Sequence, residues 1–181
     1  ISIIKTIFMK KKLAKLLWLT GLSGSGKTTL ANSVYKNLLK HNFKVLKIDG
    51  DIFRKKTKNI NNFSKKNIIH NNNEIISYVK KIEKKFDFVI VSVISPLLIT
   101  RKKAKKIFGS RYFEIYVKCS IKELIKRDTK GLYKKAKDKV ITNLIGYNSK
   151  IKYEKSKYKK IVVNTDKLNL LIYKKLIVKK I

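Results

Sequence analysis

The sequence predicts an α/β fold, in which a mostly parallel five-stranded sheet lies between two layers of helices in a three-layer α/β/α sandwich. Two observations lead to this prediction. Short apolar runs with strand character alternate with segments whose apolar residues recur at helical spacing, which is typical of a parallel sheet covered on both faces. In addition, a glycine-rich segment joins the first apolar run to the first helical segment.

The predicted strands are short and rich in apolar residues. In chain order they cover Leu16–Thr20, Lys44–Ile48, Phe86–Ile94, Arg111–Lys118 and Lys160–Asn164. The third run is the most apolar. We expect it to be a central strand that is buried on both faces, because helices cover both sides of a parallel sheet.

The predicted helices follow apolar residues spaced three or four positions apart. They cover Lys27–Lys40, Glu74–Lys85, Ile99–Phe108, Ile121–Arg127 and Leu168–Val178. Between the first two, residues 55–73 are polar and rich in Asn and Lys, so we expect a mobile segment that faces a substrate. Overall we expect one domain over residues 15–181, preceded by a disordered N-terminal extension over residues 1–14.

The glycine-rich segment Gly21–Thr28 matches the phosphate-binding loop pattern of Gly, four residues, Gly, Lys and Ser or Thr. A strand precedes it and a helix follows it, which is the setting that the motif requires. Glycines allow the backbone N–H groups to turn inward around a phosphate, and the helix N-terminus adds positive potential. Lys27 is expected to reach the β- and γ-phosphates and Thr28 to bind Mg²⁺. We therefore predict a P-loop NTPase fold that binds a nucleoside triphosphate.

Two carboxylates follow the second predicted strand, in the run Asp49-Gly50-Asp51. Ligands of open α/β sheets bind at the carboxyl ends of the strands. Asp49 and Asp51 are thus candidates for catalysis or metal binding. The alternative interpretation is that they cap a helix that follows the strand.

The chain carries 46 Lys and Arg residues against 11 Asp and Glu, a formal net charge of +35. Clustered basic residues would indicate a polyanion partner. Here the lysines are spread through every segment, so we expect no specific nucleic-acid partner, although the positive field should attract small anionic substrates.

The one cysteine, Cys119, allows no intrachain disulfide. With no apolar stretch long enough to span a bilayer, we expect a cytoplasmic protein with no membrane partner.

Five sequence blocks, taken in order, resemble the adenylylsulfate kinase (APS kinase) family. They are Gly21–Thr29, Asp49–Arg54, Phe63–Ser64, Ile94–Arg101 and Arg127–Ala136. The last block is the most specific, because Lys-Gly-Leu-Tyr after Arg-Asp is a signature of the family. The resemblance extends from about residue 16 to residue 165.

This resemblance implies transfer of the γ-phosphate of ATP, with Mg²⁺, to the 3′-hydroxyl of adenylylsulfate, giving 3′-phosphoadenylylsulfate. It implies that Asp51 is the catalytic carboxylate, with Asp49 and Lys27 as further catalytic residues, and that Thr28 and Asp51 hold the metal. Members of the family are often dimers, so a homodimer is also expected. The residues expected to bind ATP are Gly21, Leu22, Ser23, Gly24, Ser25, Gly26, Lys27, Thr28, Thr29, Arg127 and Lys130.

On the acceptor side, the resemblance implies that Arg54 contacts the anionic part of adenylylsulfate and that Phe63 stacks on its adenine. Lys130 is expected on a lid over about residues 128–146. Ser95 also matches a serine that is phosphorylated in some members. The residues expected to bind the acceptor are Arg54, Phe63, Asn71, Ile94, Ser95, Arg101, Lys130, Gly131 and Leu132.

The acceptor side also departs from the family pattern, because Ile68 lies near the position of a family arginine. Two other functions therefore stay open at this point. One is a related kinase that phosphorylates another small hydroxyl substrate, such as a sugar or a nucleotide-like compound. The other is a basic ATP-binding protein without transfer activity. A polynucleotide end kinase would need a continuous basic groove with exposed aromatic residues, whereas the lysines here are diffuse.

Overall fold

The computed structural model describes residues 13–56, 64–158, 160–166, 173, 175, 177 and 179–181. The predicted N-terminal extension therefore lies outside the described residues, except for Leu13 and Ala14. Ala14 is buried, and its N–H donates to the carbonyl of Glu83. Among the described residues, no helix is long and apolar enough to cross a membrane.

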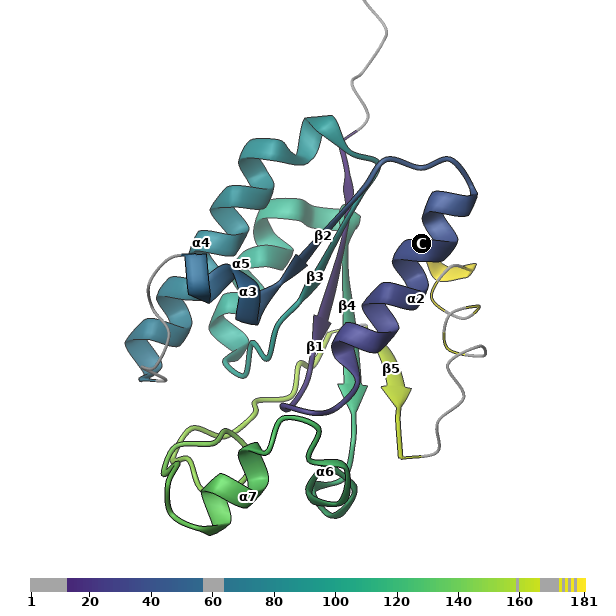
Figure 1. The fold of residues 1–181 in the computed structure, drawn as a ribbon. Helices are drawn as coiled ribbons and strands as arrows, with labels where there is room; N and C mark the ends of the chain where they lie inside the picture. The colour runs from purple at the N-terminus through teal and green to yellow at the C-terminus, as the bar shows by residue number, and fades with distance from the viewer. Residues whose placement is uncertain are drawn as a thin grey trace, which may run out of the picture.

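The described strands form one parallel sheet in the order β2-β3-β1-β4-β5 (Figure 1). Their bounds are β1 Lys15–Thr20, β2 Val45–Asp49, β3 Phe88–Ser92, β4 Tyr112–Lys118 and β5 Ile161–Asn164. The predicted five-stranded sheet is confirmed. The expected burial of β3 is confirmed as well, and β3 lies between β2 and β1. β1, which leads into the phosphate loop, is the middle strand because β3 and β4 pair with its two sides.

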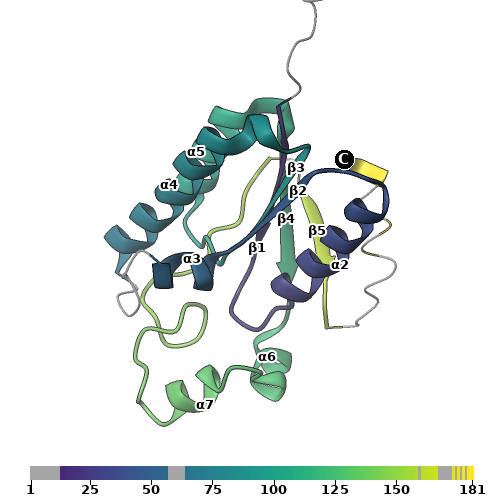
Figure 2. The same ribbon diagram turned by 45° about the horizontal axis from the view of Figure 1, so that its top comes forward.

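Helices cover both faces of the sheet, as the figures show from two directions (Figures 1 and 2). Successive side chains of a strand point to opposite faces. Leu17 and Leu19 of β1 thus pack with α2 (Lys27–Lys40) in one buried cluster. Leu16 and Trp18 pack on the other side with α4 (Lys65–Ile82) and α5 (Leu98–Phe108). The three-layer sandwich is confirmed.

Most predicted boundaries differ from the structure by no more than three residues, but α4 begins at Lys65 rather than at Glu74. Ser64 caps the helix, since its hydroxyl accepts a hydrogen bond from the Asn67 N–H at 3.3 Å. Asn71 and Asn72 are buried on the same face as the apolar residues of this helix. Residues 65–73 therefore belong to a helix and not to a mobile segment, while residues 57–63 of the predicted segment lie outside the described residues.

The remaining elements lie near the carboxyl ends of the strands or connect the layers. α3 (Gly50–Lys56) follows β2 directly. α6 (Ile121–Arg127) and α7 (Leu132–Lys137) lie at the lower edge of the sheet in Figure 1 and share a small apolar cluster. Two short 3-10 turns cover Glu83–Lys85 and Gly109–Arg111.

Of the predicted C-terminal helix, Ile177 is described and is buried in the cluster on the α2 face.

Candidate active site

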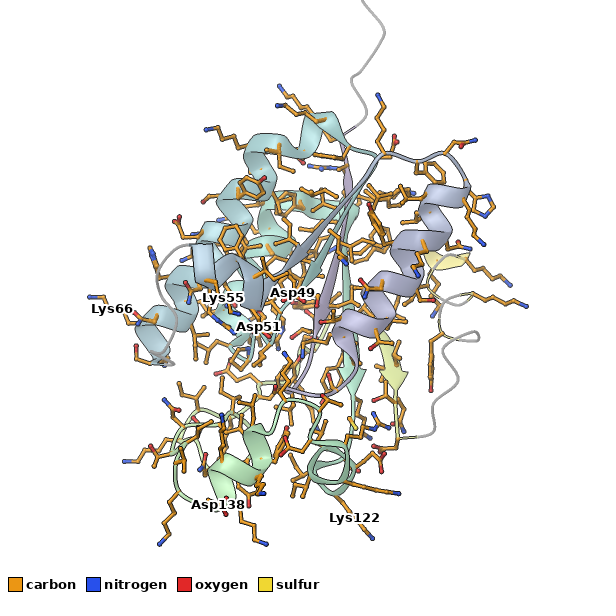
Figure 3. The ribbon with its side chains drawn as sticks, in the orientation of Figure 1. Asp49, Asp51, Lys55, Lys66, Lys122 and Asp138 are labelled. Atoms are coloured by element: carbon orange, nitrogen blue, oxygen red, sulfur yellow. The ribbon has the colours of Figure 1, made fainter. Side chains whose placement is uncertain are left out.

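A cleft opens between the carboxyl ends of the strands and the α6–α7 region. It encloses about 910 Å³, including open solvent at its mouth. Figure 3 shows Asp49 and Asp51 at the end of β2, on the side that faces this region. The residues that line the cleft are Ser23, Gly24, Gly26, Lys27, Thr28, Thr29, Asp49, Asp51, Ser92, Val93, Ile94, Arg127, Thr129, Lys130 and Thr165. The structure thus brings together most of the predicted nucleotide-side residues.

The phosphate loop takes a backbone path that only glycine adopts readily. Gly21, Gly24 and Gly26 have φ angles of 147°, 74° and 90°. Two carbonyls of the loop accept hydrogen bonds from outside it. The Tyr133 hydroxyl donates to the Ser23 carbonyl at 2.9 Å, and the Thr165 hydroxyl donates to the Ser25 carbonyl at 3.0 Å. With these carbonyls held, the loop can present its N–H groups to an anion in the cleft.

Lys27 has an unusual charge state in this loop. Its Nζ donates to the Leu22 carbonyl at 2.7 Å. Burial, together with the positive charge of Lys130, lowers the pKa of Lys27 from 10.5 to about 7, although Asp51 and Asp49 act in the opposite direction. A bound triphosphate would favour the ammonium form, because phosphate oxygens accept its hydrogen bonds and supply negative charge.

We therefore expect triphosphate binding at about pH 8 to take up about one proton per site. In the free chain Lys27 is mostly neutral at pH values above its pKa of about 7, and the bound phosphates restore its charge. Titration calorimetry in buffers of different ionisation enthalpy measures this uptake. The control is Lys27→Arg, whose side chain is always charged. Equal proton uptake by the two proteins would contradict the expectation.

The oxygen atoms beside Lys27 suit a hard cation. The Thr28 hydroxyl donates to the Asp49 carboxylate at 2.9 Å and lies 3.5 Å from the Ser92 hydroxyl. The described residues contain no cluster of three or more His, Cys, Asp or Glu side chains placed to hold a metal. Mg²⁺ usually binds through one or two protein groups, phosphate oxygens and waters. The site therefore fits a Mg²⁺ ion that arrives with the triphosphate.

Asp51 lines the cleft as the second residue of α3 and is surrounded by cations. Its carboxylate pairs with Lys130 at 2.5 Å and with Arg54. Burial acts to raise the pKa of Asp51, but the hydrogen bond and charge of Lys130 and the charges of Arg54 and Lys27 together hold that pKa below its usual value. Asp51 is therefore ionised at neutral pH. Because Lys130 belongs to the predicted lid, this ion pair also joins the lid to α3.

A second hollow adjoins the cleft beyond Asp51. The two share Val93 and Ile94 as common walls. The hollow is lined by Gly50, Arg54, Ile68, Asn71, Asn72, Ile75, Val93, Ile94, Ser95, Pro96 and Ile145. Within the described part of the chain, the buried amide oxygens of Asn71 and Asn72 have no hydrogen-bond partner. A ligand in this hollow would meet one cation, the side chains of two asparagines and apolar walls.

Four of the predicted acceptor-side residues thus lie at this hollow: Arg54, Asn71, Ile94 and Ser95. Leu132 lines a neighbouring hollow that also contains Asp51 and Arg54. Gly131 immediately precedes α7 and has a φ of 63°. Phe63 lies outside the described residues.

Two residues that were predicted to bind the acceptor, Arg101 and Ser95, are almost completely buried from solvent. Arg101 is fully buried behind the hollow and lines neither hollow nor the cleft. Ser95 is 1% exposed, and its hydroxyl lies 3.3 Å from that of Thr100. Phosphorylation of Ser95 would therefore require this wall to open.

On the ATP side, Arg127 lines the cleft from the end of α6. Its Nε donates to Glu123 at 2.9 Å, and its guanidinium donates to the Thr165 carbonyl at 2.5 Å. Sequence reasoning missed Thr165 and Ser92 as lining residues. Each occupies the end of a strand, so the argument that selected Asp49 and Asp51 could have found both.

Comparison with known protein sequences finds one family that matches most of the chain. The family model described as Adenylylsulphate kinase matches residues 13–164. The probable adenylyl-sulfate kinase of Archaeoglobus fulgidus is 36% identical over 151 residues, covering 83% of this chain and 96% of the relative. The adenylyl-sulfate kinase of Clostridium acetobutylicum is 35% identical over 159 residues, covering 88% of this chain and 78% of the relative.

Solved structures show the same similarity in three dimensions. The Mycobacterium tuberculosis APS kinase in complex with AMPPNP and APS matches with a TM-score of 0.84 at 28% identity, covering 92% of this chain and 96% of that one. Shikimate kinase from Aquifex aeolicus matches at 18% identity with a TM-score of 0.54, covering 91% of this chain and 94% of that one, and this likeness shows the fold alone. The chain has the P-loop kinase fold, and it belongs to the adenylylsulphate kinase family.

Proposed function

We propose that this protein transfers the γ-phosphate of ATP to the 3′-hydroxyl of adenylylsulfate, giving 3′-phosphoadenylylsulfate. The observation that carries the proposal is the position of Asp51. It lines both the phosphate-loop cleft and the hollow that Arg54 and Leu132 also line, and it pairs with Arg54. Family membership supports the same reaction.

Phosphoryl transfer needs positioned cations and an oriented hydroxyl more than it needs covalent chemistry from the protein. When bound with ATP, a Mg²⁺ ion would supply positive charge that offsets the negative charge of the phosphates. Thr28 and Asp51 would hold that ion, with Asp49 beside it as the hydrogen-bond acceptor of the Thr28 hydroxyl. Lys27 and Lys130 would bind the phosphates. Asp51 would orient the acceptor hydroxyl and accept its hydrogen bond.

The hollow beyond Asp51 is proposed to hold adenylylsulfate. Arg54 would pair with the anionic group of the acceptor, while Asn71, Ile94 and Ser95 would contact the rest of the molecule. Phe63, Gly131 and Leu132 are proposed to complete the pocket. On the other side, Arg127 would lie along the adenine of ATP. A closed lid would keep water, a competing acceptor, away from the γ-phosphate.

The proposal is tested by measuring ATP turnover with Mg²⁺, with and without adenylylsulfate, and by identifying the product. We expect adenylylsulfate to stimulate turnover and 3′-phosphoadenylylsulfate to form in equal amount to ADP. If ATP binds but adenylylsulfate neither binds nor stimulates turnover, the proposed acceptor is wrong. Sugars and other small hydroxyl compounds would then be tested as acceptors.

We also propose that the enzyme acts in the cytoplasm as a homodimer. The single cysteine, Cys119, supports a reducing compartment, because the chain can form no disulfide within itself. The resemblance to a family whose members are often dimers supports the assembly. Light scattering after gel filtration would measure the mass, and a monomeric mass of 21.1 kDa would contradict the dimer.

A further inference from the structure

The segment Ile94–Pro96 forms a wall of the acceptor hollow and has a strained backbone. Ser95 has a φ of 42°, in a region that residues other than glycine rarely adopt. Such a conformation persists only where neighbouring groups hold it. The Thr20 hydroxyl donates to the Ile94 carbonyl at 2.6 Å and lies 3.3 Å from the Ser95 carbonyl. The Arg101 guanidinium also donates to the Ser95 carbonyl.

Arg101 connects this wall to a second segment of the chain. Its side chain is fully buried, and its guanidinium also donates to the Glu154 carbonyl. The Glu154 N–H donates to the Pro96 carbonyl at 2.9 Å, and the Glu154 carboxylate accepts from the Leu98 N–H at 2.5 Å. The wall is therefore joined to Glu154 directly at Pro96 and through the Arg101 guanidinium at Ser95, and Glu154 also binds the first residue of α5.

A buried guanidinium needs a counter-charge, because an unpaired buried charge is strongly unfavourable. Glu114 of β4, whose side chain is 1% exposed, supplies it at 3.4 Å from the Arg101 Nε. The Glu114 carboxylate also accepts hydrogen bonds from the Ser156 hydroxyl at 2.6 Å and the Tyr158 hydroxyl at 2.7 Å. Burial and the charge of Glu114 raise the pKa of Tyr158, so that its phenol remains a donor at neutral pH.

From this network we propose that Glu114 is a positioning residue for the acceptor side of the site, acting through Arg101 on the Ile94–Pro96 wall. Glu114 lines neither the nucleotide cleft nor the hollows that contain Arg54. Ile94 lines the nucleotide cleft as well, and its carbonyl accepts from the Gly21 N–H at 3.3 Å. The phosphate loop, however, is also held by Tyr133 and Thr165, so the effect of Glu114 should fall mainly on the acceptor and much less on ATP. This inference rests on the proposed function, because it assigns the wall to acceptor binding.

The test is the variant Glu114→Gln, which keeps the size of the side chain and removes its charge. We expect KM for adenylylsulfate to rise about tenfold, the size of effect that follows when a buried polar group loses its partner, while the Kd for ATP changes less than about twofold. Tyr158→Phe, a milder change in the same network, should raise that KM by about threefold. Equal changes for both substrates, or none for adenylylsulfate, would overturn the proposal.

The matched control is Glu83→Gln. Glu83 is a carboxylate with a side chain that is 2% exposed and pairs with Lys80 and Arg111, far from the wall at the opposite edge of the sheet. It should lose thermal stability as Glu114→Gln does, yet keep both substrate constants. If Glu83→Gln raises KM for adenylylsulfate as much as Glu114→Gln, the effect is general destabilisation and the proposal fails.

A second measurement does not depend on the acceptor. Hydrogen exchange followed by mass spectrometry should show faster exchange in residues 94–100 of Glu114→Gln than of Glu83→Gln. If the unchanged protein does not phosphorylate adenylylsulfate, the proposed function fails, but this measurement still tests the link between Glu114 and the wall. Equal exchange in the two variants would show that the link is absent.

Discussion

Replacing Asp51 with asparagine is expected to lower kcat about a thousandfold while ATP binding stays within a few-fold of that of the unchanged protein. The carboxylate is ionised at neutral pH because Lys130, Arg54 and Lys27 hold its pKa below the usual value, even though burial opposes them. Asparagine keeps the shape but cannot accept the proton of the acceptor hydroxyl or balance these cations. Single-turnover kinetics with calorimetric ATP titration would separate the two effects.

Asp138→Asn is the matched control for this variant. Asp138 is an exposed carboxylate immediately after α7, on the outer side of the α6–α7 region (Figure 3). Its replacement should leave kcat unchanged. The proposed role of Asp51 would be contradicted if Asp51→Asn retained more than about a tenth of the turnover, since acid–base or orienting groups contribute far more than that. Loss of ATP binding in parallel with turnover would instead assign Asp51 to nucleotide binding.

Replacing Gly21 with alanine is expected to cost about 4 kcal/mol or more of the free energy of unfolding. Two effects add at this position. Its φ of 147° is unfavourable for a side chain, and a Cβ atom would lie 2.3 Å from the carbonyl oxygen of Val117. That oxygen belongs to the backbone of β4, which pairs with β1 and β5 and so cannot give way. Chemical denaturation would measure the loss.

The variant Gly109→Ala separates the cost of backbone strain from the cost of the steric clash that a Cβ atom would cause at Gly21. Gly109 also has a positive φ, 59°, but a Cβ atom there would meet no atom within 4 Å. This variant should lose about 1–2 kcal/mol from backbone strain alone. If the two alanine variants were equally stable, the close approach of Gly21 to β4 would have no energetic consequence, contrary to our expectation.

Most residues of the predicted nucleotide side line one cleft, and the sequence could indicate them because its signals there are local. The loop from Gly21 to Thr28 needs particular residues at consecutive positions, and a strand and a helix must flank it. Asp49 and Asp51 could be selected because one ends β2 and the other lies two residues later, and the carboxyl ends of parallel strands meet at one edge. Such signals can be read without knowing what the distant parts of the chain contact.

The acceptor side was harder to predict because its residues depend on contacts between segments far apart in the sequence. The polar run before Glu74 looked like a mobile segment, yet Ser64 caps a helix there and Asn71 turns inward. Arg101 was expected in the pocket, but its partners Glu114 and Glu154 lie on other elements and hold it behind the wall. Composition and spacing contain no information on such pairings.

Glu114 shows the difference between what local sequence patterns specify and what contacts between distant segments specify. A carboxylate inside the apolar run of β4 must find a partner when it is buried, but we did not select Glu114 from the sequence. The sequence by itself determined the α/β sandwich, the phosphate loop and the two aspartates, because periodicity and local motifs specify them. Only the tertiary structure decided which groups support the acceptor wall, because burial of charge is settled by the packing of β4, α5 and the segment around Glu154.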